Sequence, residues 1–284
     1  MIGASRSLVW LFLPVALALY AYSAIKVDRV PRPREKDLLS VAIPAPVQVI
    51  LAGGDRFLAA NVAVLRALAI GGGELDRATY QILGRVQSDA ARLNPAHEDN
   101  YYISQAILPW NGEVNADLLI QQAATAARPW DAMPPFFLGF DYYYFLHDSI
   151  AGAKNLQIAA QRSPPGNREA VLVMAAHWTE KSDDPRVAIG IIDAMAKGTR
   201  DRELKHHLEA RIERLQGLAL LRDAAKLFAA RERRPPADIA ELLGPGLLVT
   251  LPADPLGQGY ALDKNGVPII AAAMPAKIPE RKTQ

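Results

Sequence analysis

Three prolines recur at a nearly constant spacing in the middle of this chain. Pro95, Pro129 and Pro164 stand at almost equal intervals, and each follows an apolar segment that ends in a short polar stretch. Proline interrupts a helix because it lacks a backbone N–H and its ring clashes with the preceding turn. A period of roughly 34 residues is typical of stacked helix pairs. The spacing therefore predicts a mainly α-helical array of about three to four helix pairs over residues 44–201.

Apolar residues at helical spacing locate one helix near the start of this array. Leu58, Val62, Leu65 and Leu68 recur every three or four positions, as on one face of a helix. Asp55 precedes the run and is a suitable N-cap residue. The pattern predicts a helix that begins directly after Asp55.

Small residues between the second and third prolines indicate that two helices approach each other closely. Gly139 lies in the first of these expected helices and Ala151 in the second, and Tyr142 follows Gly139 by three. Together with Pro164, this pattern resembles the tetratricopeptide repeat (TPR) superfamily, whose helix-turn-helix unit has a small residue early in each helix. The resemblance is strongest in this segment and implies such repeats over roughly residues 64–200.

Two polar residues depart from the family pattern in the preceding repeat. Gln105 and Asp117 stand where small residues are expected, although Ala106 and Ala116 lie one place away. The pattern also fades over residues 167–199. The resemblance indicates the fold rather than the function, because TPR arrays bind very different partners.

The TPR resemblance also implies a place for a partner, because in that family the first helix of each pair lines the concave groove. The matching positions here are Tyr102, Ala106, Trp110, Met133, Phe136, Phe140, Tyr143, Tyr144, Val171, Ala175 and Trp178. We expect an aromatic groove for an extended peptide or an amphipathic helix, with tyrosine hydroxyls making polar contacts. The alternative is that Phe136, Phe140 and Trp178 simply pack between helices.

A long capping helix is predicted over residues 202–234, where apolar and charged residues alternate at helical spacing. We expect its charged run, which includes Arg211 and Arg214, to form a solvated face. The residues expected to face the core are Leu215, Leu218, Leu221 and Leu227.

Residues 235–274 are predicted to form a small α+β unit, because strand-like segments alternate with turn sequences. A short helix is expected at 237–243, and strand-like segments at 247–251, 260–262 and 267–270. The stretch Leu251-Pro252-Ala253-Asp254-Pro255-Leu256-Gly257, after a long helix, resembles the ending of pseudopilins. Residues 275–284 are expected to be a flexible tail.

The N-terminus carries an uncharged run of membrane-spanning length. Ser7 to Ile25 contains 19 residues without a charge, close to the ~20 that cross a hydrocarbon core. Residues 1–29 are therefore predicted to anchor the chain in the lipid bilayer through residues 7–25, and the proline-rich residues 30–43 to form a stiff linker. A secretory signal cleaved near Ala21-Tyr22-Ser23 is the alternative.

The charges that flank this run leave the topology open. Arg6 precedes it, whereas the basic residues that follow it are Lys26, Arg29, Arg32, Arg34 and Lys36. The positive-inside rule would place the bulk of the chain in the cytoplasm. The resemblance to anchored TPR-like proteins of bacterial envelopes implies the opposite, a single-pass inner-membrane protein with its bulk in the periplasm.

The composition and the motifs of the sequence give no support to a catalytic role. The 32 Lys+Arg nearly balance 30 Asp+Glu, which gives no support to nucleic-acid binding, and no cysteine is present. His206 and His207 are adjacent, so they project to different faces of a helix and cannot share a metal ion. Asp254 and Asp263 could hold calcium, although turn formation is the plainer interpretation. We predict no catalytic residue, no metal and no cofactor.

These observations together predict a membrane-anchored scaffold that docks a peptide or protein partner in the envelope, for example in a secretion, pilus or polysaccharide-export system. An envelope enzyme that uses the groove for a small substrate is one alternative, and a pseudopilin-like structural subunit is another. A titratable cluster in a deep pocket would favour the enzyme, and an open aromatic groove would favour docking.

Overall fold

The computed structural model describes the backbone of residues 4–28, 42–70 and 75–271, and the side chains of residues 14–26, 42–69 and 75–271. These residues form eleven α-helices and one small antiparallel sheet, which confirms the expected mainly helical fold with a small hairpin. The elements are α1 (Ala4–Asp28), α2 (Ala45–Leu51), α3 (Arg56–Ile70), α4 (Arg77–Leu93), α5 (Glu98–Ile107), the 3-10 helix η2 (Pro109–Asn111), α6 (Val114–Ala127), α7 (Met133–Tyr144), α8 (Ser149–Arg162), α9 (Pro165–Thr179), α10 (Pro185–Gly198), α11 (Arg202–Glu232), the 3-10 helix η3 (Ile239–Leu242), β1 (Tyr260–Leu262) and β2 (Pro268–Ile270).

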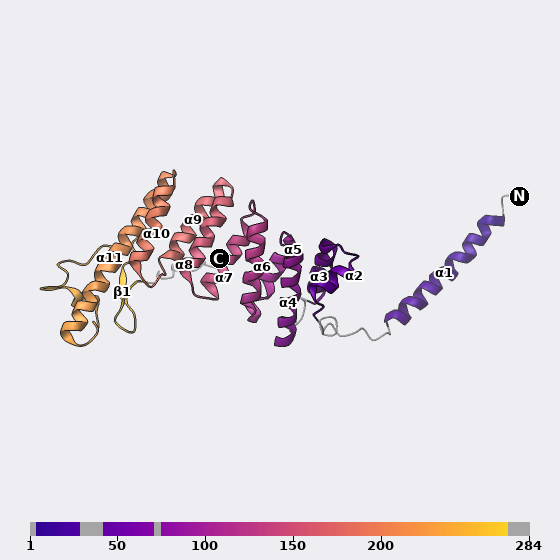
Figure 1. Cartoon of the computed structure of the whole chain (residues 1–284), viewed down its shortest axis with the longest axis horizontal. Coiled ribbons are helices and arrows are strands. Elements are labelled where there is room, and N and C mark those ends of the chain that lie inside the picture. The colour runs from indigo at the N-terminus through magenta and orange to yellow at the C-terminus, as the bar shows by residue number, and fades with distance from the viewer. Residues whose placement is uncertain (1–3, 29–41, 71–74, 272–284) are drawn as a thin grey trace, which may run out of the picture.

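Helices α2 to α11 stand in one row, in which each helix packs mainly on its neighbours in the chain (Figure 1). The core is correspondingly divided into successive clusters rather than one centre. This is the packing of helical repeat proteins, in which each unit contacts only the next. The α9–α10 contact is thin, and α10 packs on α11 instead. That change occurs where the sequence repeat fades.

The three periodic prolines lie in the turns between helix pairs. Pro95 separates α4 from α5, Pro129 separates α6 from α7, and Pro164 precedes α9. Side-chain caps begin several of the helices, including α3, where Asp55 accepts hydrogen bonds from the amides of Phe57 (2.8 Å) and Leu58 (3.1 Å). The expected helix after Asp55 is therefore confirmed.

Two glycines make the close approach between α7 and α8. A Cβ at Gly139 would lie 2.9 Å from the Gly152 carbonyl oxygen, and a Cβ at Gly152 would lie 3.0 Å from that of Gly139. The sequence pattern assigned this contact to Ala151, which is one residue too early. The backbones meet at Gly152 because its missing side chain also leaves room for Trp178, 3.2 Å away.

The long helix α11 buries more charge than its sequence suggests. Leu215, Leu218 and Leu221 are buried as expected, but Leu227 is 58% exposed, so its assignment to the core was wrong. The assignment of Arg211 and Arg214 to a solvated face was also wrong, because they are 8% and 4% exposed.

Ion pairs with buried carboxylates explain why the side chains of Arg211 and Arg214 are buried. Both lie against the carboxylate of Glu180, the residue directly after α9, and Arg214 Nε also donates to Asp254 Oδ1 at 2.8 Å. Each buried guanidinium therefore has a carboxylate partner, which offsets much of its desolvation cost.

The C-terminal unit is attached to α11 through the turn that begins at Asp254 and through Tyr260. Asp254 accepts hydrogen bonds from the amides of Leu256, Gln258 and Gly259, and Tyr260 Oη donates to the Arg214 carbonyl at 2.8 Å. The strands at 260–262 and 268–270 pair as expected. The segment 247–251 is not a strand, and only η3 is helical within 237–243.

The N-terminal expectations fall largely on residues that the structure describes incompletely. Every described side chain of α1, residues 14–26, is exposed. Within the described residues no single helix qualifies by length and hydropathy as a membrane span, whereas α2 and α3 qualify as a pair bent by 109°. Side chains 7–13 of the expected span, most of the linker at 30–43 and all of the tail at 275–284 lie outside the described residues.

Candidate functional site

Four aromatic side chains form a partly exposed cluster at the ends of α5 and α7. Its members, here called the aromatic cluster, are Trp110, Phe140, Tyr144 and Phe145. The ring centroids of Trp110 lie 5.5 Å from Tyr144 and 5.1 Å from Phe145, and Phe140 stacks on Tyr144 at 5.3 Å. Trp110 and Tyr144 are 55% and 51% exposed. The cluster is a rigid apolar surface with a phenol hydroxyl at its edge.

Local sequence places these rings together. Pro109 begins the 3-10 helix η2, which ends at Asn111. Gly112 follows with a φ of 86°, in the left-handed region, so the chain turns two residues after Trp110. Phe140 and Tyr144 are four positions apart on α7 and therefore lie on one face of that helix. Phe145 was not among the expected groove residues, although it directly follows this aromatic run in the sequence.

An open hollow lies next to the aromatic cluster. It has a volume of about 580 Å³ and is lined by Tyr143, Tyr144, His147, Ser149 and Lys181. The Tyr143 ring stacks on Trp178 with the centroids 4.3 Å apart and the planes within 4° of each other. Tyr144 therefore belongs to the aromatic cluster on one side and to the hollow on the other.

His147 borders the hollow in a conformation that usually requires glycine. Its φ is 55°, in the left-handed region. The Asp148 amide donates to the Tyr142 carbonyl at 2.8 Å, and this bond closes the C-terminal end of α7. Asp148 then caps α8 through the Ala151 amide at 2.8 Å. The loop beside the hollow is thus fixed by two consecutive helix-end motifs.

The remaining expected groove residues divide between surface and core. Tyr102 is 39% exposed and lies 5.4 Å from Phe137, apart from the aromatic cluster. Met133 packs against the core of α3 to α6, and Phe136 packs against the core around Trp178. Trp178 is only 7% exposed, so the structure corrects its placement in a groove. It packs between helices because Gly152 leaves space for its ring.

A buried polar layer lies beneath this surface and joins α5, α6 and α7. Gln105 Nε2 donates to Asp141 Oδ1 at 2.9 Å, and Gln121 Nε2 donates to the Tyr101 carbonyl at 2.8 Å and to Asp117 Oδ1 at 3.3 Å. Asp117 and Asp141 are 0% exposed. Gln105 and Asp117, the two departures from the family pattern, are thus parts of one polar layer.

The two carboxyls of this layer, Asp117 and Asp141, have raised pKa values because they are buried. Burial, together with a hydrogen bond and the charge of Asp141, raises the pKa of Asp117 to about 9, and burial also raises the pKa of Asp141. Asp141 Oδ2 has no donor among the described groups. A proton on Asp117 supplies that donor, because two carboxylates this deep cannot both be ionised.

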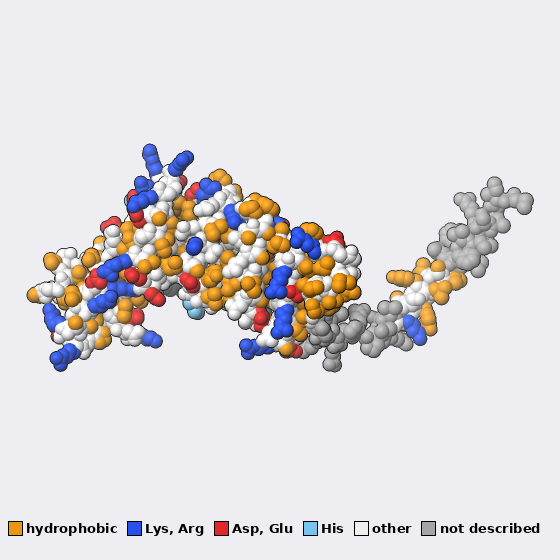
Figure 2. Space-filling model, in the orientation of Figure 1, with side chains coloured by type: hydrophobic (Ala, Val, Ile, Leu, Met, Phe, Trp, Pro, Cys, Tyr) orange, Lys and Arg blue, Asp and Glu red, His pale blue; other side chains and the backbone are white. Residues whose placement is uncertain are grey.

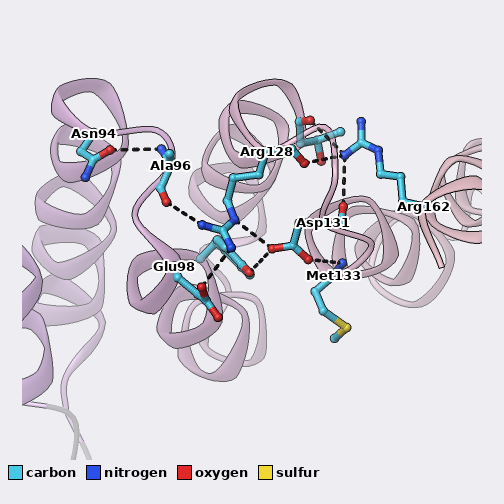
Figure 3. A network of polar contacts seen from close by, with 9 residues as sticks. Asn94, Ala96, Glu98, Arg128, Asp131, Met133 and Arg162 are labelled. Carbon is cyan, nitrogen blue, oxygen red and sulfur yellow. Dashed lines mark hydrogen bonds and ion pairs between the residues drawn. The ribbon is translucent and has the colours of Figure 1, made fainter. Parts of the chain in front are cut away.

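Two arginines, one repeat apart, hold successive junctions of the array (Figure 3). Arg128 donates to the Ala96 carbonyl at 3.1 Å, to Glu98 at 2.9 Å and to Asp131 at 2.8 Å. Asp131 also accepts from Tyr101 Oη at 2.6 Å and from the Met133 amide at 2.9 Å.

The second arginine, Arg162, lies one repeat after Arg128 and has the corresponding role. It donates to the carbonyls of Thr125, Arg128 and Asp131 at 3.1 to 3.2 Å (Figure 3). Each arginine satisfies the carbonyl groups left open at the preceding junction. These contacts fix the angle between successive pairs and hence the position of the aromatic cluster.

Other titratable groups are engaged in structure. Asp263 accepts hydrogen bonds from the Asn265 and Val267 amides at 2.8 Å, so it forms a turn, as Asp254 does. Among the described residues, no group of three or more His, Asp or Glu side chains is placed to hold a metal ion.

A second hollow, of about 680 Å³ between α8, α9 and the end of α10, has a wall of mixed charge. Of these charges, Asp201 caps α11 and Arg168 bonds a carbonyl of α8.

No protein-family model, curated protein or solved structure matches this chain. The described residues therefore define the class of the protein by architecture alone. It is an array of successive packed helices, closed by a small hairpin, with a partly exposed aromatic cluster.

Proposed function

We propose that this protein is a membrane-anchored docking module that binds a peptide segment of a protein partner on the aromatic cluster. The observation that carries the proposal is the exposure of Trp110 and Tyr144, at 55% and 51%, in contact with each other at 5.5 Å. Tryptophan and tyrosine dominate binding hot spots because they bury a large area at a small conformational cost. The adjacent hollow at His147 and Lys181 accommodates one side chain of the segment.

The stacked packing of successive helices supports docking rather than catalysis. The inter-pair prolines, the glycine contact between α7 and α8, and the repeated junction arginines are all features of a stacked helix-pair scaffold. The buried Asp117–Asp141 pair is closed to solvent. A catalytic carboxyl must reach its substrate, so this pair favours a structural role over the alternative of an envelope enzyme.

Attachment to the bacterial inner membrane through residues 7–25, with the array in the periplasm, is part of the same proposal. The uncharged run and the helical backbone of α1 support it. A C-terminal reporter fusion tests the topology. Activity only of a periplasmic reporter is expected, and activity only of a cytoplasmic reporter would reverse the orientation.

The pseudopilin-like ending is proposed to cap the array rather than to build a filament. Its turn residue Asp254 is ion-paired with Arg214 of the same chain, and Tyr260 Oη passes over Gly217 and donates to a backbone carbonyl of α11. Contacts of this kind close the last helix of an array, whose outer face otherwise has no neighbour.

Selection of peptides on the full-length protein tests the docking site. Peptides from a random library that bind the wild-type chain should lose roughly 30-fold or more in affinity when both aromatic anchors are removed, as for hot-spot residues. The test protein is the Trp110→Ala, Tyr144→Ala double variant. Its urea unfolding should stay close to that of the wild type, because both side chains are half exposed.

Trp130 provides the matched control. It is 67% exposed at the turn between α6 and α7, and its ring faces the Arg128 guanidinium at 5.6 Å rather than the aromatic cluster. Trp130→Ala should leave the selected peptides bound. Equal losses in Trp130→Ala and in the double variant, or no loss in either, would reject the aromatic cluster as the binding site.

A further inference from the structure

Helix α3 has its large apolar side chains on the outside. The buried face of α3 is mostly alanine, because Ala59, Ala60, Ala63 and Ala67 are 0–2% exposed, and the other buried side chain described in this helix is Val64. The side chains on the opposite face are 47–63% exposed, and they are Phe57, Leu58, Val62, Leu65 and Leu68. A helix that needs only its neighbour in water turns its largest apolar groups inward. The arrangement of α3 indicates that its outer face has an apolar partner.

The exposed face continues onto α2. Val47, Ile50 and Leu51 are 43%, 75% and 73% exposed, and the two helices form the first unit of the array. Figure 2 shows hydrophobic side chains gathered over this end of the row, the end that follows α1 in the chain. Eight large apolar side chains thus share one end of the molecule, more than single scattered surface residues account for.

Two features of this unit match a lipid bilayer. Together α2 and α3 have the length and composition of a membrane segment, but a bend of 109° lies between them, which suits helices lying on a bilayer rather than crossing it. Residues 26–66 also carry seven basic and four acidic residues. One of the acidic residues, Asp55, caps α3. A net positive segment that adjoins the apolar helices in the sequence favours a surface with anionic headgroups.

We propose that α2 and α3 lie on an anionic phospholipid bilayer, with the outer side chains of α3 among the acyl chains. The array then meets the membrane at its first unit, and α11 points away from it. The inference is independent of peptide docking and adds a second membrane contact to the proposed anchor.

The absence of cysteine from the sequence permits a direct test. A single Leu65→Cys substitution in the full-length chain is labelled with the environment-sensitive dye NBD, and the protein is reconstituted into vesicles of phosphatidylcholine and phosphatidylglycerol. The label at position 65 should shift its emission to the blue and lose intensity when doxyl-labelled lipids are included. Position 65 is 63% exposed, so the label does not disturb the core.

Leu227→Cys on α11 is the matched control, because Leu227 is also a leucine, 58% exposed, at the other end of the array. Its label should show neither the shift nor the quenching. Equal quenching at both positions, or none at position 65, would overturn the proposal. A blue shift at position 65 without lipid quenching, growing with protein density, would identify a second copy as the occupant and would also overturn it.

Leu17→Cys in α1 separates this proposal from that of the anchor. Quenching at position 17 but not at 65 rejects the α2–α3 contact and leaves the anchor standing. Quenching at 65 but not at 17 rejects the anchor and leaves the α2–α3 contact standing. Undiminished quenching at 65 in phosphatidylcholine alone would overturn the preference for anionic lipid.

Discussion

The two ends of the helical array bury opposite kinds of side chain. At the first end, α3 packs alanines against α4 and leaves leucines on its outer face. At the last end, α11 buries five of its seven leucines and, in addition, Arg211 and Arg214. Both helices are rich in alanine and leucine, but α11 carries many more charged residues than α3. Their neighbours differ as well, because one face of α3 packs on α4, whereas α11 packs on both α10 and the folded C-terminal unit.

The comparison shows how an array can be closed in two ways. The C-terminal end is covered by its own chain, because Asp254 and Tyr260 of the C-terminal unit bond to Arg214 on α11. The N-terminal end has no such cover among the described residues, and its apolar surface suits a membrane. The membrane contact proposed at the first end would therefore orient the whole array.

The largest expected effect is at the covered end. Arg214→Met removes the guanidinium between Glu180 and Asp254 and leaves two buried carboxylates with less compensation. Breaking a buried pair in this way costs roughly 3–5 kcal/mol. Urea unfolding of the full-length protein in detergent measures it. Arg231→Met, which breaks an exposed pair with Glu232, should cost no more than about 1 kcal/mol, and equal losses in the two variants would contradict the buried network.

The same substitution at the two ends should have very different effects on stability. Leu215→Ala on α11 removes a side chain that is 0% exposed and should lower the free energy of unfolding by about 2–5 kcal/mol. Leu65→Ala on α3 removes one that is 63% exposed and should change it by no more than about 0.5 kcal/mol in detergent-free buffer. Comparable losses would mean that α3 buries its outer face in solution.

The middle of the array buries two carboxyl groups, Asp117 and Asp141, and their contribution to stability should depend on pH. Burial raises the pKa of Asp117 to about 9, well above its ordinary value of about 4 in the unfolded chain. The contribution of this group is therefore complete below pH 4 and declines as pH rises toward 9, by about 1 kcal/mol per pH unit for one proton. Asp117→Asn keeps a donor for Asp141 and binds no proton.

Unfolding of both proteins between pH 5 and 8 measures this difference. The Asp117→Asn variant should gain stability relative to the wild type with each step in pH, and the gain should be largest at pH 8. A difference that stays constant across this range would show that the carboxyl pair does not hold its proton in the folded state.

Much of the helical layout could be predicted from local signals, and the exceptions have a common cause. Pro95, Pro129 and Pro164 mark turns because proline acts on the backbone of its own neighbourhood. Arg214 could not be placed correctly, because its partners Glu180 and Asp254 lie far before it and far after it in the sequence. Burial of a charge depends on such distant partners, and helical spacing contains no record of them.

The candidate site divides in the same way. Phe140 and Tyr144 could be assigned to one face of a helix from their spacing. Trp178 occupies a corresponding helical position but is buried, because the backbone contact between α7 and α8 at Gly152 opens a space for it. The roles of Gln105 and Asp117 depended on Asp141, which belongs to the next repeat.

The sequence by itself determined where most helices begin and end, since caps, prolines and the helical period act within a few residues. Only the tertiary structure decided which face of each helix is buried. In α3 both faces are apolar, so periodicity alone gives no direction. The alanine face packs inward because small side chains let α4 approach closely, and the leucine face is thereby left exposed.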